Sequence, residues 1–183
     1  NDPRGLRDKA IILLGFATAC RRSELAALVV EDLREHKEGI IIEIRRSKGD
    51  QEGEGHLKLV RYGKDPKTCP IRALKTWLSS ASIRSGSIFR SIGNDLQVAE
   101  TAISPLGISR AIKRAATNAG LNASLLGAHS LRAGFVTEAD ARGARTSDIM
   151  AQTGHKSTQM ISIYTRYNVD EQFETSTALD VGL

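Results

Sequence analysis

Apolar residues recur at helical spacing along most of this chain, and this periodicity restricts its fold more than any other feature. Between residues 6 and 17 they lie on one face of a helix whose start is marked by Asp2 and Pro3. The pattern continues, with breaks at Gly120 and Gly143, in residues 23–29, 71–78, 105–119, 131–142 and 147–152. The sequence therefore predicts a mostly helical chain.

One region departs from the helical pattern. Residues 40–44 form a β-branched run after a break at Glu38 and Gly39, and residues 57–62 alternate apolar with basic side chains. A segment with three glycines, residues 47–55, separates them, so we expect a β-hairpin. The predicted fold class is mostly α (α+β), with one small antiparallel sheet near the front of the chain. Further on we expect a short helix at 158–167 and a polar tail.

The composition fits a soluble, globular domain. With 183 residues, 40% of them hydrophobic, the chain is long enough for one sizeable core. Its longest uncharged apolar stretch, residues 10–20, is far shorter than the ~18 residues that a membrane span needs. The two cysteines, Cys20 and Cys69, indicate a reducing, cytoplasmic compartment. A net charge of +5 mildly favours a polyanionic partner.

The common catalytic motifs are missing from the sequence. It contains no GxxxxGK[ST] loop, no GxGxxG, no GxSxG elbow and no HExxH zinc motif. The four histidines are too dispersed for a local zinc site; they are His36, His56, His129 and His155. The sequence thus supports neither ATP nor metal chemistry, and we expect no cofactor.

Four short segments carry residues that suit phosphate chemistry. Arg21 stands at a break between two predicted helices, where its guanidinium can grip a phosphate and Glu24, one turn on, can orient it. A plain surface ion pair between these two side chains is the alternative. Lys48 lies on a glycine-containing turn, from which it can either reach a substrate or stay solvated.

The other two segments lie nearer to the C-terminus. His129 and Arg132 are spaced to share one face of a helix, although such pairs often arise by chance. His155 follows Gly154, and Tyr164 stands nine residues after His155. A tyrosine in such a place can act as a nucleophile, but a lone tyrosine more often packs half-buried.

The order of these residues resembles the catalytic domain of the tyrosine recombinases, the phage integrase family. The shared pattern is Arg, Lys, His-x-x-Arg, Gly-His and then Tyr nine residues later. The flanking residues match as well, in Arg46-Ser47-Lys48 and in residues 68–74, 128–134 and 152–157. The resemblance runs over nearly the whole chain, so the combined pattern is far more specific than any of its parts.

The resemblance implies a role in DNA cleavage for each of these side chains. Tyr164 would attack a DNA phosphodiester, leaving a 3′-phosphotyrosyl bond and a free 5′-hydroxyl. Arg21 and Arg132 would clamp the non-bridging oxygens, and Lys48 would protonate the departing 5′-oxygen. Fixed cationic donors suit a reaction that spreads negative charge over a phosphate. Because the phosphotyrosyl bond conserves the bond energy, rejoining would need no ATP.

The remaining positions would support these groups. His129 matches the residue that handles the tyrosine proton, and His155 matches a histidine that donates to a phosphate oxygen. Glu24 resembles an acidic residue that holds the arginine in place. Arg22, where many members carry an aliphatic residue, is a candidate contact to a DNA phosphate.

The resemblance also implies a larger assembly. Residues 1–183 would be the catalytic domain, with 168–183 as a C-terminal tail. Since the chain opens without a methionine, we expect an N-terminal core-binding domain upstream. The expected partner is double-stranded DNA, bound by a homotetramer on paired sites that is a monomer when free, with accessory DNA-bending proteins and no membrane. The expected location is the bacterial cytoplasm, in association with the nucleoid.

Two other functions stay open on this scaffold. A type IB topoisomerase shares the fold and much of the site, and it would relax supercoils without paired sites. A non-catalytic DNA-binding regulator would keep the fold without needing Tyr164. A single-stranded nucleic-acid binder is disfavoured, because 4% aromatic residues leave few platforms for stacking bases.

Overall fold

The computed structural model describes residues 2–45, 55–155, 157–159 and 161. Its helices are α1 (Pro3–Thr18), α2 (Arg22–Ala27), the short 3₁₀ helix η1 (Val30–Asp32), α3 (Pro70–Ser80), α4 (Pro105–Asn118), α5 (Ala128–Ala141) and α6 (Thr146–Thr153). Its strands are β1 (Leu33–His36), β2 (Gly39–Ile44), β3 (His56–Arg61), β4 (Arg90–Ile92) and β5 (Val98–Ala102). Helices dominate and the antiparallel sheets are small, so the predicted fold class is confirmed.

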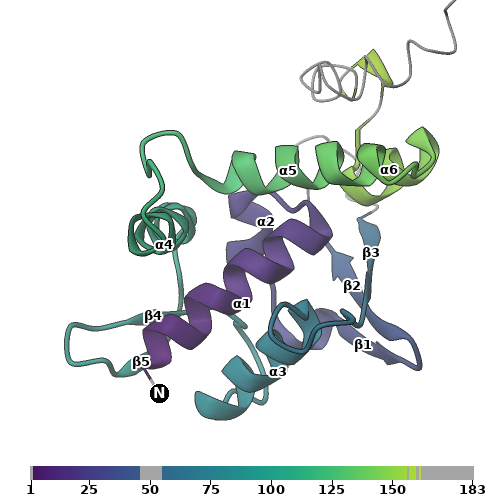
Figure 1. Ribbon diagram of the computed structural model, residues 1–183. Coiled ribbons are helices and arrows are strands. Elements are labelled where there is room, and N and C mark those ends of the chain that lie inside the picture. Colours follow the sequence, from purple (N-terminus) through teal and green to yellow (C-terminus); the bar gives the residue numbers. More distant parts are fainter. Residues whose placement is uncertain (1, 46–54, 156, 160, 162–183) are drawn as a thin grey trace, which may run out of the picture.

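Helix α1 runs through the middle of the fold (Figure 1). Its start is the predicted one, because the Asp2 carboxylate accepts a hydrogen bond from the Arg4 backbone N–H at 2.9 Å and Pro3 opens the first turn. In the view of Figure 1, α3 lies below α1 and α5 above it, and both pack against α1, as does α4. The buried face of α1, which includes Ile11 and Leu14, therefore forms the centre of the core.

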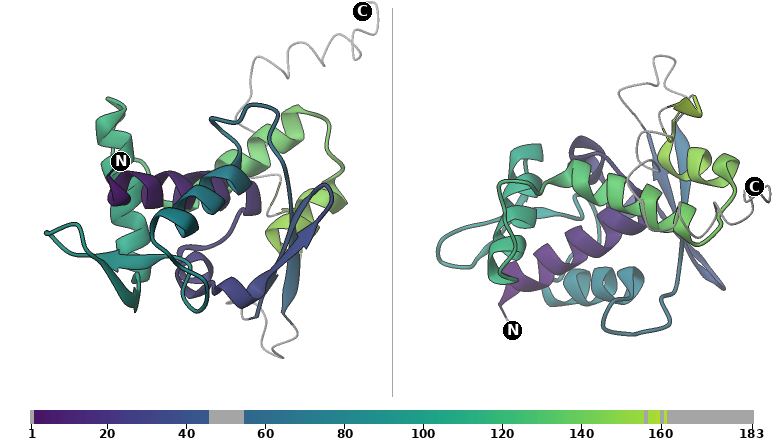
Figure 2. Two further views of the ribbon diagram at one scale, coloured as in Figure 1. Left: turned by 90° about the horizontal axis from the view of Figure 1, so that it is seen from below. Right: turned by 45° about the horizontal axis from the view of Figure 1, so that its top comes forward.

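The three-stranded sheet stands beyond one end of α1 (Figures 1 and 2). β2 is its central strand and pairs antiparallel with β1 and with β3. The predicted hairpin is confirmed as the β2–β3 pair, in a register that sets Ile44 opposite His56. Ile40, Ile42 and Ile44 are buried, so this strand closes the core on the side of the sheet.

The strands differ from the prediction in two places. Residues 33–36, which no predicted strand included, form β1 along the edge of β2. Residues 90–92 and 98–102 form a second antiparallel pair, β4–β5, where only one sheet was predicted. These strands are short and mostly not buried. They lack the alternation that identifies a strand, and their pairing partners decide their conformation.

The helices predicted as far as residue 152 are confirmed, with small differences at their ends. α5 begins earlier than residue 131, because Gly127 precedes it as N-cap and its backbone N–H donates to Ser130 Oγ at 3.1 Å. The helix expected at 158–167 falls largely outside the described residues, and the C-terminal tail falls wholly outside them. Within the described ranges, no helix is both long enough and apolar enough to cross a membrane.

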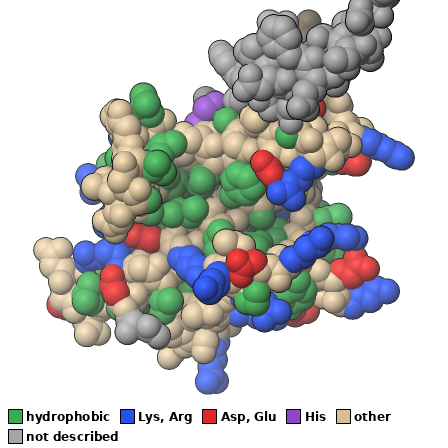
Figure 3. Space-filling model, in the orientation of Figure 1, with side chains coloured by type: hydrophobic (Ala, Val, Ile, Leu, Met, Phe, Trp, Pro, Cys, Tyr) green, Lys and Arg blue, Asp and Glu red, His purple; other side chains and the backbone are tan. Residues whose placement is uncertain are grey.

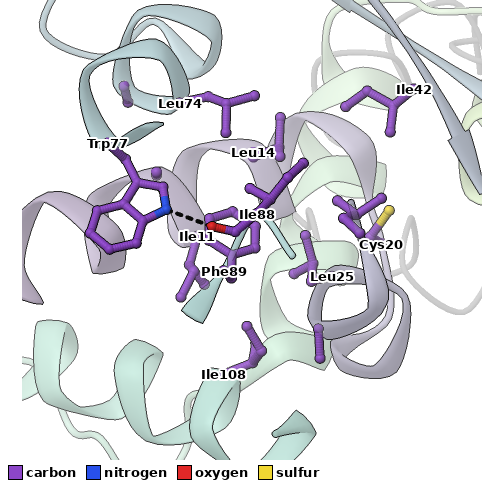
Figure 4. Close-up of a cluster of buried hydrophobic side chains, with 14 of the residues drawn as sticks. Ile11, Leu14, Cys20, Leu25, Ile42, Leu74, Trp77, Ile88, Phe89 and Ile108 are labelled. Atoms are coloured by element: carbon purple, nitrogen blue, oxygen red, sulfur yellow. Dashed lines mark hydrogen bonds between the residues drawn. The ribbon is translucent and has the colours of Figure 1, made fainter. Parts of the chain in front are cut away.

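Figure 4 shows the hydrophobic cluster on which these helices converge. Trp77, on α3, is fully buried, and its Nε1 donates a hydrogen bond to the Ile88 carbonyl oxygen at 2.8 Å. Leu14 and Cys20, at the C-terminal end of α1 and just beyond it, belong to the same cluster, as does Leu25 of α2. The core therefore anchors the segment that joins α1 to α2.

Gly39, at the start of β2, tests how closely the sheet pairs. A Cβ at this position would lie 1.9 Å from the carbonyl oxygen of Val60, so an alanine must displace backbone. We expect Gly39→Ala to lower the free energy of unfolding by about 1–3 kcal/mol, measured by urea denaturation followed by circular dichroism.

The matched control is Gly5→Ala in the exposed first part of α1. There a Cβ meets nothing closer than 3.7 Å, and alanine is favoured over glycine in a helix by roughly 0.5–1 kcal/mol. Equal stability of the two variants would mean that β2 and β3 are not paired as closely as described.

Candidate active site

Arg21 is held at the N-terminal end of α2 by Glu24. The Glu24 carboxylate accepts hydrogen bonds from the backbone N–H of Arg21 at 2.8 Å and from its guanidinium at 2.7 Å. The chain reaches this position through a sharp turn after α1, where Ala19 adopts a left-handed conformation with φ 51°. Glu24 is buried, whereas the Arg21 side chain is 30% exposed. The carboxylate thus fixes a guanidinium that still faces solvent.

Arg132 approaches the same turn from α5. Its Nη1 donates a hydrogen bond to the backbone oxygen of Ala19 at 2.9 Å, and the residue is only 3% exposed. This oxygen lies at the C-terminal end of α1, where a helix favours positive charge. The bond joins α1 to α5, and it brings Arg132 to a cavity that Arg21 also lines.

His129 lies one turn before Arg132 on α5, as their spacing predicts. It is exposed, and it lines the same cavity as Arg21 and Arg132. Its place on the helix depends on the early start of α5, because a helix beginning at 131 would have left His129 in a loop.

His155 follows α6, after a left-handed Gly154 with φ 71°. Its Nδ1 lies 3.0 Å from Thr153 Oγ1, and the residue is 7% exposed. The pKa of His155 is lowered to about 4, first by burial and then by neighbouring positive charges, which are those of Arg132, Arg21, Lys58 and His129. His155 is therefore neutral at physiological pH.

The structure thus brings together four of the predicted site residues, Arg21, His129, Arg132 and His155, with Glu24 behind them. Guanidinium and imidazole groups near one another suit an anion with several oxygens, such as a phosphodiester. In the described part of the chain, no three His, Cys, Asp or Glu side chains are grouped so that they could hold a metal ion.

Lys48 and Tyr164, the predicted proton donor and nucleophile, lie outside the described residues. The strands on either side of Lys48 are described: β2 ends at Ile44 and β3 begins at His56. The His56 ring lies against Gly154, since a Cβ at Gly154 would be 3.5 Å from His56 Nε2. The end of the hairpin that leads to Lys48 is therefore next to the end of α6.

An open cavity of about 1050 Å³ lies between α2, α4 and α5. Arg22, the predicted DNA contact, lines it, and so do Arg110 and Lys113 of α4, which were not predicted to belong to the site. Arg110 and Lys113 are spaced to share one helix face. This spacing indicates a binding site only when the position of the cavity is known. Among the described residues that line this cavity, none is acidic.

Elsewhere the surface carries mixed charge. On the face shown in Figure 3, basic and acidic side chains are interspersed. Ion pairs such as Arg34–Glu43 and Arg61–Glu38, both at 2.8 Å, neutralise parts of the three-stranded sheet. The lining of the cavity differs from this mixed surface, because its described charges are all positive.

Comparison with known proteins agrees with this geometry. Residues 1–171 match the phage integrase family, and the chain belongs to that family. The family predicted from the order of the site residues is therefore confirmed.

Two curated relatives are tyrosine recombinases or their homologues. The chain is 43% identical over 160 residues to an integrase/recombinase XerD homolog of Selenomonas ruminantium, covering 87% of this chain and 47% of the relative. It is 28% identical over 172 residues to the tyrosine recombinase XerC of Corynebacterium efficiens, covering 92% of this chain and 49% of that protein. The chain thus spans about half the length of the curated relatives it matches.

Solved structures share the fold. The XerH site-specific recombinase bound to palindromic difH substrate superposes with a TM-score of 0.73 at 21% identity, over 99% of this chain and 47% of that one. The XerA recombinase gives a TM-score of 0.72 at 22% identity, over 94% of this chain and 56% of that one. The predicted architecture of a tyrosine recombinase catalytic domain is therefore confirmed.

The buried, neutral His155 predicts a pH dependence of stability. Its pKa is about 4 in the folded chain, against an ordinary value of 6.5, so the unfolded state binds more protons between these two values. The contribution of His155 to the free energy of unfolding is therefore fully present above pH 6.5 and is lost as the pH falls toward 4. Urea denaturation at pH 7 and pH 4.5 measures the difference.

We expect His155→Gln to reduce this loss of stability on acidification. His36→Gln, at an exposed histidine of β1, serves as the control and keeps the wild-type pH dependence. If His155→Gln loses as much stability on acidification as the wild type, then His155 is not the group that binds the extra proton.

Proposed function

We propose that this chain is the catalytic domain, residues 1–183, of a site-specific DNA recombinase that cleaves and rejoins strands through a 3′-phosphotyrosyl intermediate. The observation that carries the proposal is the meeting of Arg21 and Arg132 at the turn after α1, with His129 and His155 beside them. These groups come from separate parts of a chain that belongs to the phage integrase family.

In the proposed reaction a DNA phosphodiester occupies the point on which the cations converge. Arg21 and Arg132 bind its non-bridging oxygens, and neutral His155 donates an N–H to one of them. These donors stabilise the charge that develops on the phosphoryl group as it is attacked. Because Glu24 and the Ala19 carbonyl already orient the two arginines, little reorganisation accompanies the reaction.

The covalent step forms one bond, breaks one bond and transfers two protons. The Tyr164 hydroxyl oxygen forms a bond to phosphorus while the bond from phosphorus to the 5′-oxygen breaks. A tyrosine hydroxyl has a pKa near ~10, so its proton must be taken up as it attacks, and His129 accepts it. Lys48 gives a proton to the departing 5′-oxygen. In the reverse step a 5′-hydroxyl oxygen forms a bond to phosphorus while the bond from phosphorus to the Tyr164 oxygen breaks. Lys48 takes the proton of the 5′-hydroxyl and the Tyr164 oxygen regains its own from His129, so no ATP or metal ion is needed.

The cavity is the proposed binding surface for double-stranded DNA. Arg22, Arg110 and Lys113 supply positive charge along it, beside the two arginines of the site. Contacts of this kind bind phosphates without reading sequence, so affinity falls steeply with salt.

We propose a homotetramer on paired sites that is monomeric when free. Residues 168–183 form a C-terminal tail, a core-binding domain lies upstream, and accessory DNA-bending proteins take part. The site of action is the nucleoid in the bacterial cytoplasm.

Tyr164→Phe tests the nucleophile. The chain is incubated at low salt with negatively supercoiled plasmid, in EDTA and without ATP, and the reaction is quenched with SDS. We expect the wild type to give a protease-sensitive protein–DNA adduct and Tyr164→Phe to give none, because phenylalanine has no oxygen to attack phosphorus.

The matched control is Tyr62→Phe. The Tyr62 hydroxyl accepts a hydrogen bond from Lys75 on the surface, away from the cavity, so its loss leaves the adduct intact. An adduct that persists in Tyr164→Phe assigns the nucleophile to another residue. A wild type that relaxes plasmid but never exchanges strands between two sites is a topoisomerase. A wild type that forms no adduct even when joined to the proposed core-binding domain favours the regulator.

Lys48→Ala tests the proton donor. We expect it to slow adduct formation by about 100- to 10,000-fold on ordinary DNA, the range for loss of a general acid. A 5′-thiolate leaving group needs little protonation, so DNA with a bridging 5′-sulfur restores most of the rate. Lys37→Ala, in the exposed turn between β1 and β2, is the control. If the sulfur substrate restores nothing, Lys48 is not the proton donor.

A further inference from the structure

Lys58 is a buried lysine on a strand whose exposed side carries two leucines. On β3, Lys58 and Val60 face the interior, while Leu57, Leu59 and Arg61 are exposed. Lys58 stands opposite Ile42 of β2 and is 0% exposed. A lysine is almost never fully buried unless its ammonium group has a partner, because removing that charge from water is costly.

The partner of Lys58 lies on α6. Its Nζ donates a hydrogen bond to the main-chain oxygen of Gln152, in the last turn of that helix. The Gln152 side chain also binds β3 and α1, since its Nε2 donates hydrogen bonds to the backbone oxygens of Leu59 at 3.1 Å and Ala17 at 2.8 Å. β3, the end of α6 and the end of α1 are thereby joined at one point.

His155 follows this joint directly. Gln152 is followed by Thr153, whose Oγ1 lies 3.0 Å from His155 Nδ1, and then by Gly154. On the other side of the joint, β3 is the strand that leaves the segment containing Lys48. One ammonium group therefore connects the strand after the predicted proton donor to the helix before His155.

Burial opposes the charge of Lys58 more than any other influence, and the charged groups around it have opposing effects. Glu24 and Cys20 favour its charged form, whereas Arg132 and Arg21 oppose it. Burial raises the pKa of the Cys20 thiol to about 11, so this group is neutral and supplies no negative charge at physiological pH. Burial, first, and then the two arginines lower the pKa of Lys58 from its ordinary value. A group that stability alone does not favour, placed beside a candidate active site, indicates a role in function.

We propose that Lys58 is a positioning residue of the phosphate site, which holds the end of α6, and with it His155, against the hairpin that carries Lys48. This inference rests on the proposed function. Lys58 does not touch DNA, because it is enclosed by β2, β3 and α6. It acts by fixing the end of α6 against β3, the strand that follows Lys48 in the sequence.

Lys58→Met separates this role from a merely structural one. Methionine has nearly the length of lysine, so it fills the same space, and it removes the cost of burying an ammonium group whose hydrogen-bond acceptor is a neutral carbonyl. We expect Lys58→Met to melt at or above the wild-type temperature and to bind plasmid DNA within about twofold of the wild type. Its rate of adduct formation falls roughly 10- to 100-fold, the usual effect of a misplaced catalytic group.

The leaving group distinguishes positioning from proton donation. A bridging 5′-sulfur substrate, which restores the rate of Lys48→Ala, leaves Lys58→Met slow, because the defect lies in geometry. Lys37→Met, at an exposed lysine, is the matched control and keeps the wild-type rate. Recovery of Lys58→Met on the sulfur substrate would make Lys58 a proton donor and overturn the positioning role.

A second measurement does not depend on activity. His155 is faced by Arg132 and His129 of α5, by Arg21 before α2 and by Lys58 of β3, and burial is the main cause of its low pKa. Lys58→Met removes one positive charge and loosens the end of α6, so both effects raise the midpoint at which the His155 ring titrates in NMR spectra. The Lys37→Met variant leaves that midpoint unchanged.

The two measurements keep the proposals apart. A wild type that forms no adduct even when joined to the proposed core-binding domain defeats the proposed function, while a raised His155 midpoint in Lys58→Met still supports the positioning of α6 by Lys58. An unchanged midpoint, or an unchanged rate on ordinary DNA, overturns the positioning role even if the wild type forms adducts.

Discussion

The candidate site depends on holding several positive charges close together inside the protein. Arg21, Arg132 and Lys58 all act on His155, and like charges repel strongly where water is excluded. Each of the three cations is fixed by a different acceptor: the Glu24 carboxylate, the Ala19 carbonyl and the Gln152 carbonyl. Two of these acceptors are backbone oxygens near helix C-termini, where negative partial charge is greatest. Main-chain oxygens at helix ends thus hold two of the cations in place. A carboxylate in the same position would neutralise their charge.

The turn after α1 shows how the backbone contributes. Ala19 is fully buried and left-handed, a conformation that costs a non-glycine residue roughly 1–2 kcal/mol. The turn aims the Ala19 carbonyl at Arg132 and starts α2 with Arg21 at its N-cap. Strained backbone of this kind persists where the surrounding structure holds it, and such places are often functional. Here the hydrophobic core fixes the turn, since Cys20 and Leu25 are buried on either side of Arg21.

Most of the helices and the hairpin were predictable because they depend on local patterns. The helix start at Asp2 and Pro3 depends on neighbouring residues, and so does the pairing of Arg21 with Glu24 one turn later. His129 and Arg132 shared a face for the same reason. The order of the site residues then identified the family, although no single segment was specific. The mechanism assigned to Lys48 and Tyr164 goes beyond these patterns and rests on the resemblance.

Features that depend on long-range pairing were not predictable. β1, β4 and β5 lack alternation, and they exist because a partner strand lies beside them. Arg110 and Lys113 matter only once α4 lies across a cavity from Arg22. Lys58 is the clearest case, because an alternating strand with lysine at an inward position predicts either a shifted register or a solvated edge. Its partner is a main-chain oxygen 94 residues away. Every residue has such an oxygen, so the sequence does not show which one accepts the hydrogen bond. The residues that orient a site through backbone contacts are therefore those that sequence patterns identify last.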